Sequence, residues 1–383
     1  MSFPFCGCAA LTTAFTIRWR TEIRNFPQRE ELKSSDLIDF CTQGLANSVN
    51  LQSFVWVRFG TLNSRILLAI LGHLSLQELE INARNRGLFD DTILPQLTSV
   101  TRIKLLDPSL SVIDILPAWL KSLTNPLQHL SIVGSCQSWL TDELLEQISE
   151  DLSGLEELTL KDWNSVTHEG LVKALRHNKN GIKCLTIRDL SHLFDVPEFD
   201  RRCRLKPHLL SRLTSLTITI DRASAWKEAV SSLVTLSTLE CLLLCGSPRI
   251  TDTGAQMDDF VTTLVSAHGS RLREFSLHRV LISPQALGDV CVGIKGLRRL
   301  SIWIRFRHLN LIGDSLSKAT KLNMLYVTPL RIRLGKLKLM SPTAEEAMRI
   351  ANHCSPTLTK IKFVGQIWLK GRSSKWEKQG KRV

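Results

Sequence analysis

The sequence predicts a single α/β solenoid shaped like a horseshoe, in which short parallel strands form the inner sheet and helices form the outer wall. An apolar-x-x-apolar-x-apolar pattern recurs along the chain, and the apolar residues between its copies have helical spacing. No Gly/Ser-rich or Pro-rich linker interrupts the recurrence, so a division into separate domains is not predicted.

The repeated pattern predicts one strand per copy. Its last two apolar positions flank a polar residue, as in Leu158-Thr159-Leu160, which is the period of a strand with one buried face. Ala14, Ile17 and Trp19 form a candidate thirteenth copy. The twelve clear copies lie 24 to 36 residues apart and begin at Leu51, Leu76, Val100, Leu127, Leu155, Ile182, Leu213, Leu239, Leu272, Leu297, Leu322 and Leu358.

The segments between copies carry helix signals. Leu144, Leu145, Ile148 and Leu152 follow Thr141 at helical spacing, and a capping box is expected at 343–346. One strand and one helix cannot cover their own apolar face, so neighbouring repeats must stack. We therefore expect an N-terminal cap or degenerate first repeat in residues 1–50, a repeat array in 51–363 and a basic tail in 364–383.

Composition narrows the class of protein. With 43% hydrophobic and 22% charged residues the chain should fold, and no uncharged apolar run approaches the ~20 residues that cross a membrane. Its ten cysteines include no C-x-x-C pair, so Cys184, Cys241 and Cys291 are interpreted as reduced thiols in or near the core of a cytoplasmic or nuclear protein. No membrane, metal or cofactor partner is predicted.

Catalytic motifs are absent from the sequence. It contains no G-x-x-x-x-G-K-[ST] phosphate loop, no H-E-x-x-H metal motif and no G-x-S-x-G nucleophile turn. The closest histidines on one expected helix, His168 and His177, are too far apart to share a metal at i, i+4 spacing. A binding protein is therefore expected rather than an enzyme.

Three of the segments between strands share a further motif. They are Leu140-Thr141-Asp142-Glu143-Leu144-Leu145, Val166-Thr167-His168-Glu169-Gly170-Leu171 and Ile250-Thr251-Asp252-Thr253-Gly254. They resemble the I-T-D-x-G-L step of the cysteine-containing leucine-rich repeats, which are typical of the F-box/leucine-rich-repeat substrate receptors of cullin-RING ubiquitin ligases. The resemblance implies a leucine-rich-repeat solenoid, and the copies of the pattern give it about 12–13 repeats.

The same resemblance implies a function and partners. It predicts a protein-interaction scaffold like the substrate-recognition part of such a receptor, with a ubiquitination substrate and an F-box-binding cullin adaptor as partners. No recognisable F-box precedes the repeats, and the nearest approach is Phe26-Pro27-Gln28-Arg29-Glu30-Glu31-Leu32. The F-box is therefore missing, lost or supplied by another chain.

Partner-binding residues are expected on the concave face and rim of the solenoid, where side chains have no core role. For each of them a solvated polar position, or for tryptophan a packing role, is the alternative. The candidates are Arg102, Lys104, His129, Glu157, Trp163, Lys183, Arg273, Arg298, Arg299 and Trp303.

The C-terminal quarter is strongly basic. From Lys295 onward lie 20 of the 49 Lys and Arg residues but only four of the 36 Asp and Glu residues. The alternating segment 330–339 predicts an extended strand with one apolar and one basic face, either an edge strand protected by its charges or a binding surface. The alternative function is thus nucleic-acid or acidic-partner binding through a basic patch of Arg331, Arg333, Lys336, Lys338, Lys370, Arg372 and Lys375.

Overall fold

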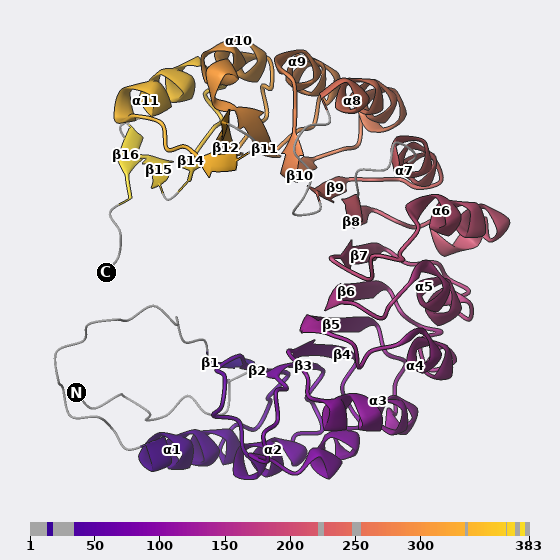
Figure 1. Ribbon diagram of the computed structural model, residues 1–383. Coiled ribbons are helices and arrows are strands. Elements are labelled where there is room, and N and C mark those ends of the chain that lie inside the picture. The colour runs from indigo at the N-terminus through magenta and orange to yellow at the C-terminus, as the bar shows by residue number, and fades with distance from the viewer. Residues whose placement is uncertain are drawn as a thin grey trace. The chain divides into compact units, whose positions relative to one another are not determined.

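The computed structural model describes residues 14–17, 34–220, 226–246, 254–333, 336–364, 366–371 and 376–379. They form two compact units. The first holds the described residues through Ile182 together with Leu190–Phe194, and the second holds Lys183–Asp189 and the described residues from Asp195 onward. Both consist of alternating strands and helices (Figure 1).

In the first unit each strand pairs in parallel with the next strand along the chain, and helices connect them. The candidate thirteenth copy is confirmed as a strand at Ala14–Ile17, paired with the strand that follows. The elements are β1 (Ala14–Ile17), α1 (Ser34–Ala46), β2 (Ser53–Trp56), α2 (Ser64–Leu71), β3 (Glu78–Asn82), the 3₁₀ helix η2 (Asp91–Gln96), β4 (Arg102–Leu106), α3 (Leu110–Ser122), β5 (His129–Gln137), α4 (Asp142–Gln147), β6 (Glu157–Trp163) and α5 (His168–Leu175).

The second unit repeats this arrangement and ends differently. Its elements are β7 (Cys184–Arg188), α6 (Val196–Leu205), η3 (Pro207–Leu209), β8 (Ser215–Ile220), α7 (Trp226–Thr235), β9 (Cys241–Gly246), α8 (Gly254–His268), β10 (Glu274–Leu281), α9 (Pro284–Gly293), β11 (Arg299–Arg305), η4 (Phe306–Leu311), α10 (Ile312–Ser317), β12 (Met324–Arg333), β13 (Lys336–Leu339), α11 (Ala344–His353), β14 (Lys360–Phe363), β15 (Gln366–Lys370) and β16 (Trp376–Lys378). The order β7 to β12 and then β14 is parallel, whereas β15 and β16 join as antiparallel strands.

Segment 330–339 differs from the expected single strand. Its first half continues β12 and its second half is β13, and the two pair antiparallel with Leu330 opposite Leu339. Alternation alone predicts extended backbone and does not reveal where a chain reverses, which explains the difference. The described part of the predicted basic tail forms β15 and β16.

The core of each unit is built from the repeated pattern. All three apolar positions of all twelve copies are buried, and in the first unit Leu79, Ile103, Leu130 and Leu158 form one cross-strand row. The side chains of Thr141 and Ser283 accept the N–H groups of Leu144 and Ala286 and so cap α4 and α9. Thr343 and Glu346 form the capping box of α11.

The I-T-D-x-G-L step connects successive repeats. The Asp142 carboxylate in α4 accepts hydrogen bonds from the backbone N–H and the hydroxyl of Thr167, at 2.8 and 2.5 Å, and Thr167 caps α5. In the second unit the Ser283 hydroxyl, which caps α9, likewise donates to Asp258 Oδ1 of α8 at 2.6 Å. An aspartate in one helix thus fixes the N-terminus of the next helix.

Strands in both units have a left-handed residue at or near their carboxyl end. The residue two positions after the last apolar residue of the copy has φ of 51° at Asp107, 61° at Asp162, 50° at Asp189 and 59° at Arg279. Aspartate tolerates this region better than most residues. At Asp162 and Arg279 the strand continues beyond this residue, and its pairing with a neighbouring strand resumes in a shifted register. Within the described residues, no helix combines the length and the apolar character that crossing a membrane requires.

Candidate binding surface

The strand positions that alternate with the buried apolar residues of the first unit form two rows, which are polar except at Val55. Because the strands are parallel and in register, residues at the same position of successive copies become direct neighbours. One row runs Ser53, Glu78, Arg102, His129, Glu157, and the other runs Val55, Glu80, Lys104, Ser131, Thr159. We call Glu78, Glu80, Arg102, Lys104, His129 and Glu157 the charged ladder.

The charged ladder is joined by contacts from strand to strand. Lys104 Nζ lies 3.0 Å from Glu80 Oε1. The Glu157 carboxylate contacts two other side chains: Arg102 Nη2 lies 3.5 Å from its Oε1, and His129 Nδ1 lies 2.8 Å from its Oε2. The arginine and lysine side chains stay 44% and 38% exposed, so they remain available to a partner.

Burial lowers the pKa of His129, and the positive charges of Arg102 and Lys104 lower it further. Glu157 acts in the opposite direction but does not reverse the shift. Desolvation of the imidazolium thus outweighs the attraction of one partly exposed carboxylate. The ladder consequently carries a neutral imidazole at pH 7.

We expect an NMR titration of the full chain to give His129 a pKa below 6.5, the value of an unperturbed histidine. Because the folded pKa is lowered, the contribution of His129 to stability is complete above about pH 6.5 and is lost as the pH falls through the folded pKa. In His129→Gln this part of the pH dependence should disappear. A measured pKa above 6.5 would show that Glu157 dominates instead.

The structure contradicts one predicted rim residue. The Trp163 side chain is fully buried in the first unit, and its Nε1 donates to the backbone oxygen of Ile132 at 2.9 Å. It ends β6 directly after Asp162, whose left-handed backbone interrupts the alternation of exposed and buried side chains along the strand. Trp163 is therefore a core residue that no partner reaches.

The remaining rim and face candidates lie in the second unit. Arg273 Nε is 3.6 Å from Glu240 Oε2, and Arg299 Nη1 is 2.9 Å from Glu274 Oε1. The Trp303 ring is partly exposed and meets the His278 ring edge to face at 5.2 Å. Lys183 precedes β7, and the exposed Arg298 precedes β11.

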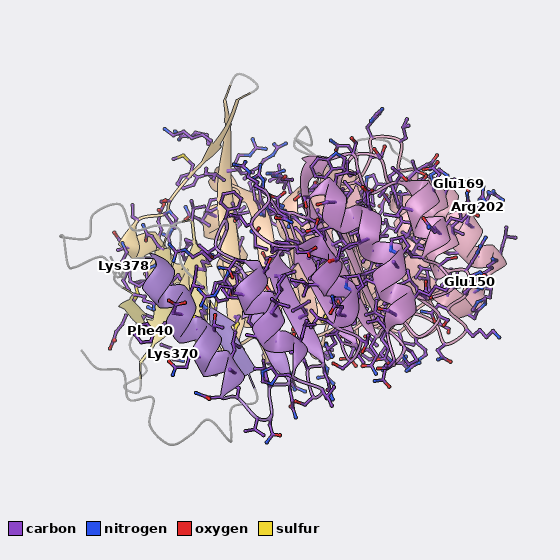
Figure 2. All side chains as sticks on the ribbon, turned by 90° about the horizontal axis from the view of Figure 1, so that it is seen from below. Phe40, Glu150, Glu169, Arg202, Lys370 and Lys378 are labelled. Atoms are coloured by element: carbon purple, nitrogen blue, oxygen red, sulfur yellow. The ribbon has the colours of Figure 1, made fainter. Side chains whose placement is uncertain are left out.

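Residues of the predicted basic patch occupy different surroundings. Arg331 and Lys338 are exposed, and Arg333 lies opposite Lys336 in the β12–β13 register. Lys370, labelled in Figure 2, donates from Nζ to the backbone oxygen of Pro356 at 3.0 Å. Arg372 and Lys375 lie outside the described residues, as does the segment from Phe26 to Leu32.

Two sets of charged surface residues were not predicted from the sequence: Glu80, and the pair Lys360 and Lys362. Glu80 has the same position in Leu79-Glu80-Ile81 as Lys104 has in its own copy, so the repeat pattern could have identified it. Lys360 and Lys362 place their Nζ atoms 6.0 and 5.8 Å from the ring centre of Tyr326, the single tyrosine of the chain. The alternation Lys360-Ile361-Lys362-Phe363 was the available signal there.

Comparison with known proteins identifies the fold of the chain. No protein-family model matches the chain, and no curated protein matches it. A chain of the yeast Rad7–Elc1 complex aligns over 86% of this chain and 76% of its own length, with 15% identity and a TM-score of 0.55. The repeat pattern and this likeness together show a leucine-rich-repeat fold.

Two other solved structures are similar over long stretches. The leucine-rich repeat-containing protein LegL7 from Legionella pneumophila has 12% identity and a TM-score of 0.43, covering 89% of this chain and 96% of its own. The TLR13–ssRNA13 complex has 14% identity and a TM-score of 0.38, covering 77% of this chain and 45% of that chain.

Proposed function

We propose that this leucine-rich-repeat protein is a scaffold that binds a protein partner through the charged ladder of its first unit. The observation that supports the proposal is the ladder itself. Its six side chains, contributed by β3, β4, β5 and β6, lie on the face opposite the core. Because these six side chains do not pack in the core, folding does not determine which residues occupy their positions. The positions can therefore carry the residues that bind a partner.

The charges of the ladder suit a partner that is itself charged. Exposed ion pairs such as Lys104–Glu80 and Arg102–Glu157 contribute little to stability, about 0–1 kcal/mol each. Their greater effect is on which partner surface can approach, because like charges brought together at an interface cost several kcal/mol. The ladder would thus select a partner by the pattern of its charges.

A more specific proposal follows from the motif resemblance. The chain would act as the substrate-recognition part of a cullin-RING ubiquitin ligase in the cytoplasm or nucleus, with an F-box-binding adaptor as second partner. The structure with the TM-score of 0.55 contains Rad7 bound to a second protein, Elc1, which is consistent with a scaffold that works in a complex.

Charge reversal tests the scaffold function. We expect Arg102→Glu with Lys104→Glu to weaken capture of the partner by roughly 10- to 100-fold, since both changes turn attraction into repulsion. The measurement is affinity purification with quantitative identification of the bound proteins, followed by titration of the purified partner. Arg65→Glu with Lys121→Glu, on α2 and α3, changes the net charge equally and serves as the control.

Equal binding by both double variants would reject the ladder as the contact surface. The ubiquitin-ligase role is tested separately in the same purification. Its support would be recovery of an F-box-binding adaptor or a cullin. If partners are recovered through the ladder but neither component appears, the scaffold proposal stands and the ligase proposal is rejected.

A further inference from the structure

The neighbouring strands β12, β14 and β15 of the second unit present an open face. Side chains that alternate with core residues lie next to one another across these strands, so Met324 is opposite Lys360 and Lys360 is opposite Leu369. Figure 1 shows α10 and α11 on the other side of these strands. We call the half-buried or exposed side chains of the open face the lysine face: Met324, Tyr326, Lys360, Lys362, Ile367 and Leu369.

The two lysines of this face have no acidic counterpart. Among the described residues, neither Lys360 nor Lys362 forms an ion pair with a carboxylate. Glu377 of β16 lies opposite Leu369, two strands away from Lys360, and pairs with neither lysine. The Nζ atoms lie 6.0 and 5.8 Å from the centre of the Tyr326 ring, at the outer limit of a cation–π contact. A carboxylate that approached this face would meet two positive charges that no ion pair neutralises.

Apolar side chains flank the lysines on both sides. Met324 and Tyr326 lie on β12, and Ile367 and Leu369 lie on β15, with Leu369 39% exposed. Tyrosine and methionine are enriched in protein–protein interfaces, whereas nucleic-acid interfaces are more polar and much more positively charged. With only two cations among its six side chains, the lysine face suits a protein that has both apolar and acidic side chains.

The strands under the lysine face have no free backbone edge. β12 pairs with β11 and β14, β14 pairs with β12 and β15, and β15 pairs with β14 and β16. An extended peptide on this face could therefore not add a strand to the sheet, and its inward N–H and C=O groups would lose their hydrogen bonds to water without replacement. A helix forms these hydrogen bonds within itself, so the face fits a helix.

The distance between the strands determines the sequence pattern of that helix. Neighbouring strands lie ~4.8 Å apart and a helix rises ~1.5 Å per residue, so a helix that crosses the strands advances by about one turn per strand. An apolar residue at position i over β12 then places positions i+3 and i+4 over Lys360 and Lys362, and position i+7 over β15. These four positions share one face of a helix.

We propose that the lysine face binds an acidic amphipathic helix of a partner protein. Acidic residues at i+3 and i+4 contact the two lysines, and apolar residues at i and i+7 contact β12 and β15. The lysine face shares no residue with the charged ladder or with the predicted basic patch. It is a second interaction surface, and it does not depend on the scaffold function proposed for the first unit.

A synthetic helical peptide tests the proposal on the full chain. The probe is a labelled alanine- and glutamine-based peptide of about 18 residues, long enough to form a helix by itself, with Leu at i and i+7 and Glu at i+3 and i+4. We expect Lys360→Glu with Lys362→Glu to weaken its binding, measured by fluorescence anisotropy, by roughly 10- to 100-fold, because two attractive contacts become repulsive. Lys206→Glu with Lys318→Glu, at the exposed C-caps of α6 and α10, changes the net charge equally and should bind like the unmodified chain.

Two altered peptides make the test specific. A peptide with Lys at i+3 and i+4 should bind the Lys360→Glu and Lys362→Glu double variant more tightly than it binds the unmodified chain, and this recovery also shows that the variant is folded. A peptide with Pro at i+2 and i+5 keeps the four contact side chains but cannot form the helix, and should bind at least about 10-fold more weakly.

Equal losses in the two charge-reversal variants would overturn the proposal, as would the absence of binding at about 1 mM peptide. A lysine peptide that binds both proteins equally would overturn it as well. A proline peptide that binds as tightly as the helical one would reject the helix as the occupant. Single-stranded DNA that binds as tightly as the peptide and displaces it would reject a protein partner.

Discussion

Trp163→Ala is expected to destabilise the first unit by about 3–5 kcal/mol, the usual cost of removing a large buried aromatic side chain. The Trp163 side chain is fully buried, and its indole N–H donates to Ile132 at 2.9 Å. Gly134 of β5 leaves the room for the indole ring, since a Cβ atom there would lie 2.9 Å from a ring carbon of Trp163. Alanine would therefore leave a cavity and remove the hydrogen bond to the backbone oxygen of Ile132.

Urea unfolding followed by circular dichroism measures this loss, and Trp303→Ala is the matched control. Trp303 is only partly buried and its ring meets the ring of His278, so its removal should cost about 1–2 kcal/mol. Equal losses from the two variants would mean that Trp163 is not the core residue described above. A loss of partner binding in folded Trp163→Ala, without a loss of stability, would restore its role as a contact residue.

Much of the fold could be predicted because the local sequence of each repeat determines the secondary structure of that repeat. The spacing Leu155, Leu158, Leu160 determines which side of a strand is buried, and Thr141 or Ser283 marks the start of a helix. Repetition then determines the neighbours: parallel strands in chain order bring position x of one copy beside position x of the next. For this reason one row contains Arg102, His129 and Glu157, each of which was predicted separately as a partner-binding residue.

The predictions for Trp163 and for segment 330–339 were wrong because the backbone changes direction there and no repeated sequence pattern marks the change. Trp163 was predicted as an exposed rim residue, but it ends β6 with its side chain buried, directly after the left-handed Asp162 at φ 61°. Likewise the alternation in 330–339 predicts extended backbone equally well for one long strand and for two short antiparallel strands. The facing of Arg331 and Lys338 depends on that reversal, so only the structure could reveal opposed charges.

The I-T-D-x-G-L step shows why a small residue is needed at one position of a helix. Gly170 lies in α5 directly over α4 of the preceding repeat, and a Cβ atom on it would lie 2.8 Å from the Cα atom of Asp142 and would overlap the Asp142 carboxylate. That carboxylate holds both the N–H and the hydroxyl of Thr167. The glycine therefore allows the two helices to approach closely enough for the aspartate to reach the next cap.

Gly170→Ala is accordingly expected to destabilise the protein by about 2–4 kcal/mol, although glycine to alanine within an ordinary helix stabilises by up to ~1 kcal/mol. The added methyl group must push back either the α4 backbone or the Asp142 side chain, and the second route breaks the hydrogen bonds to Thr167.

Asp142→Ala alone should cost about 2–3 kcal/mol through those lost bonds to a charged acceptor. In the double variant the carboxylate overlap is absent, so the combined loss should be smaller than the sum of the single losses. Urea unfolding of the four proteins measures this coupling, and additive losses would show that Gly170 and Asp142 do not act on the same contact.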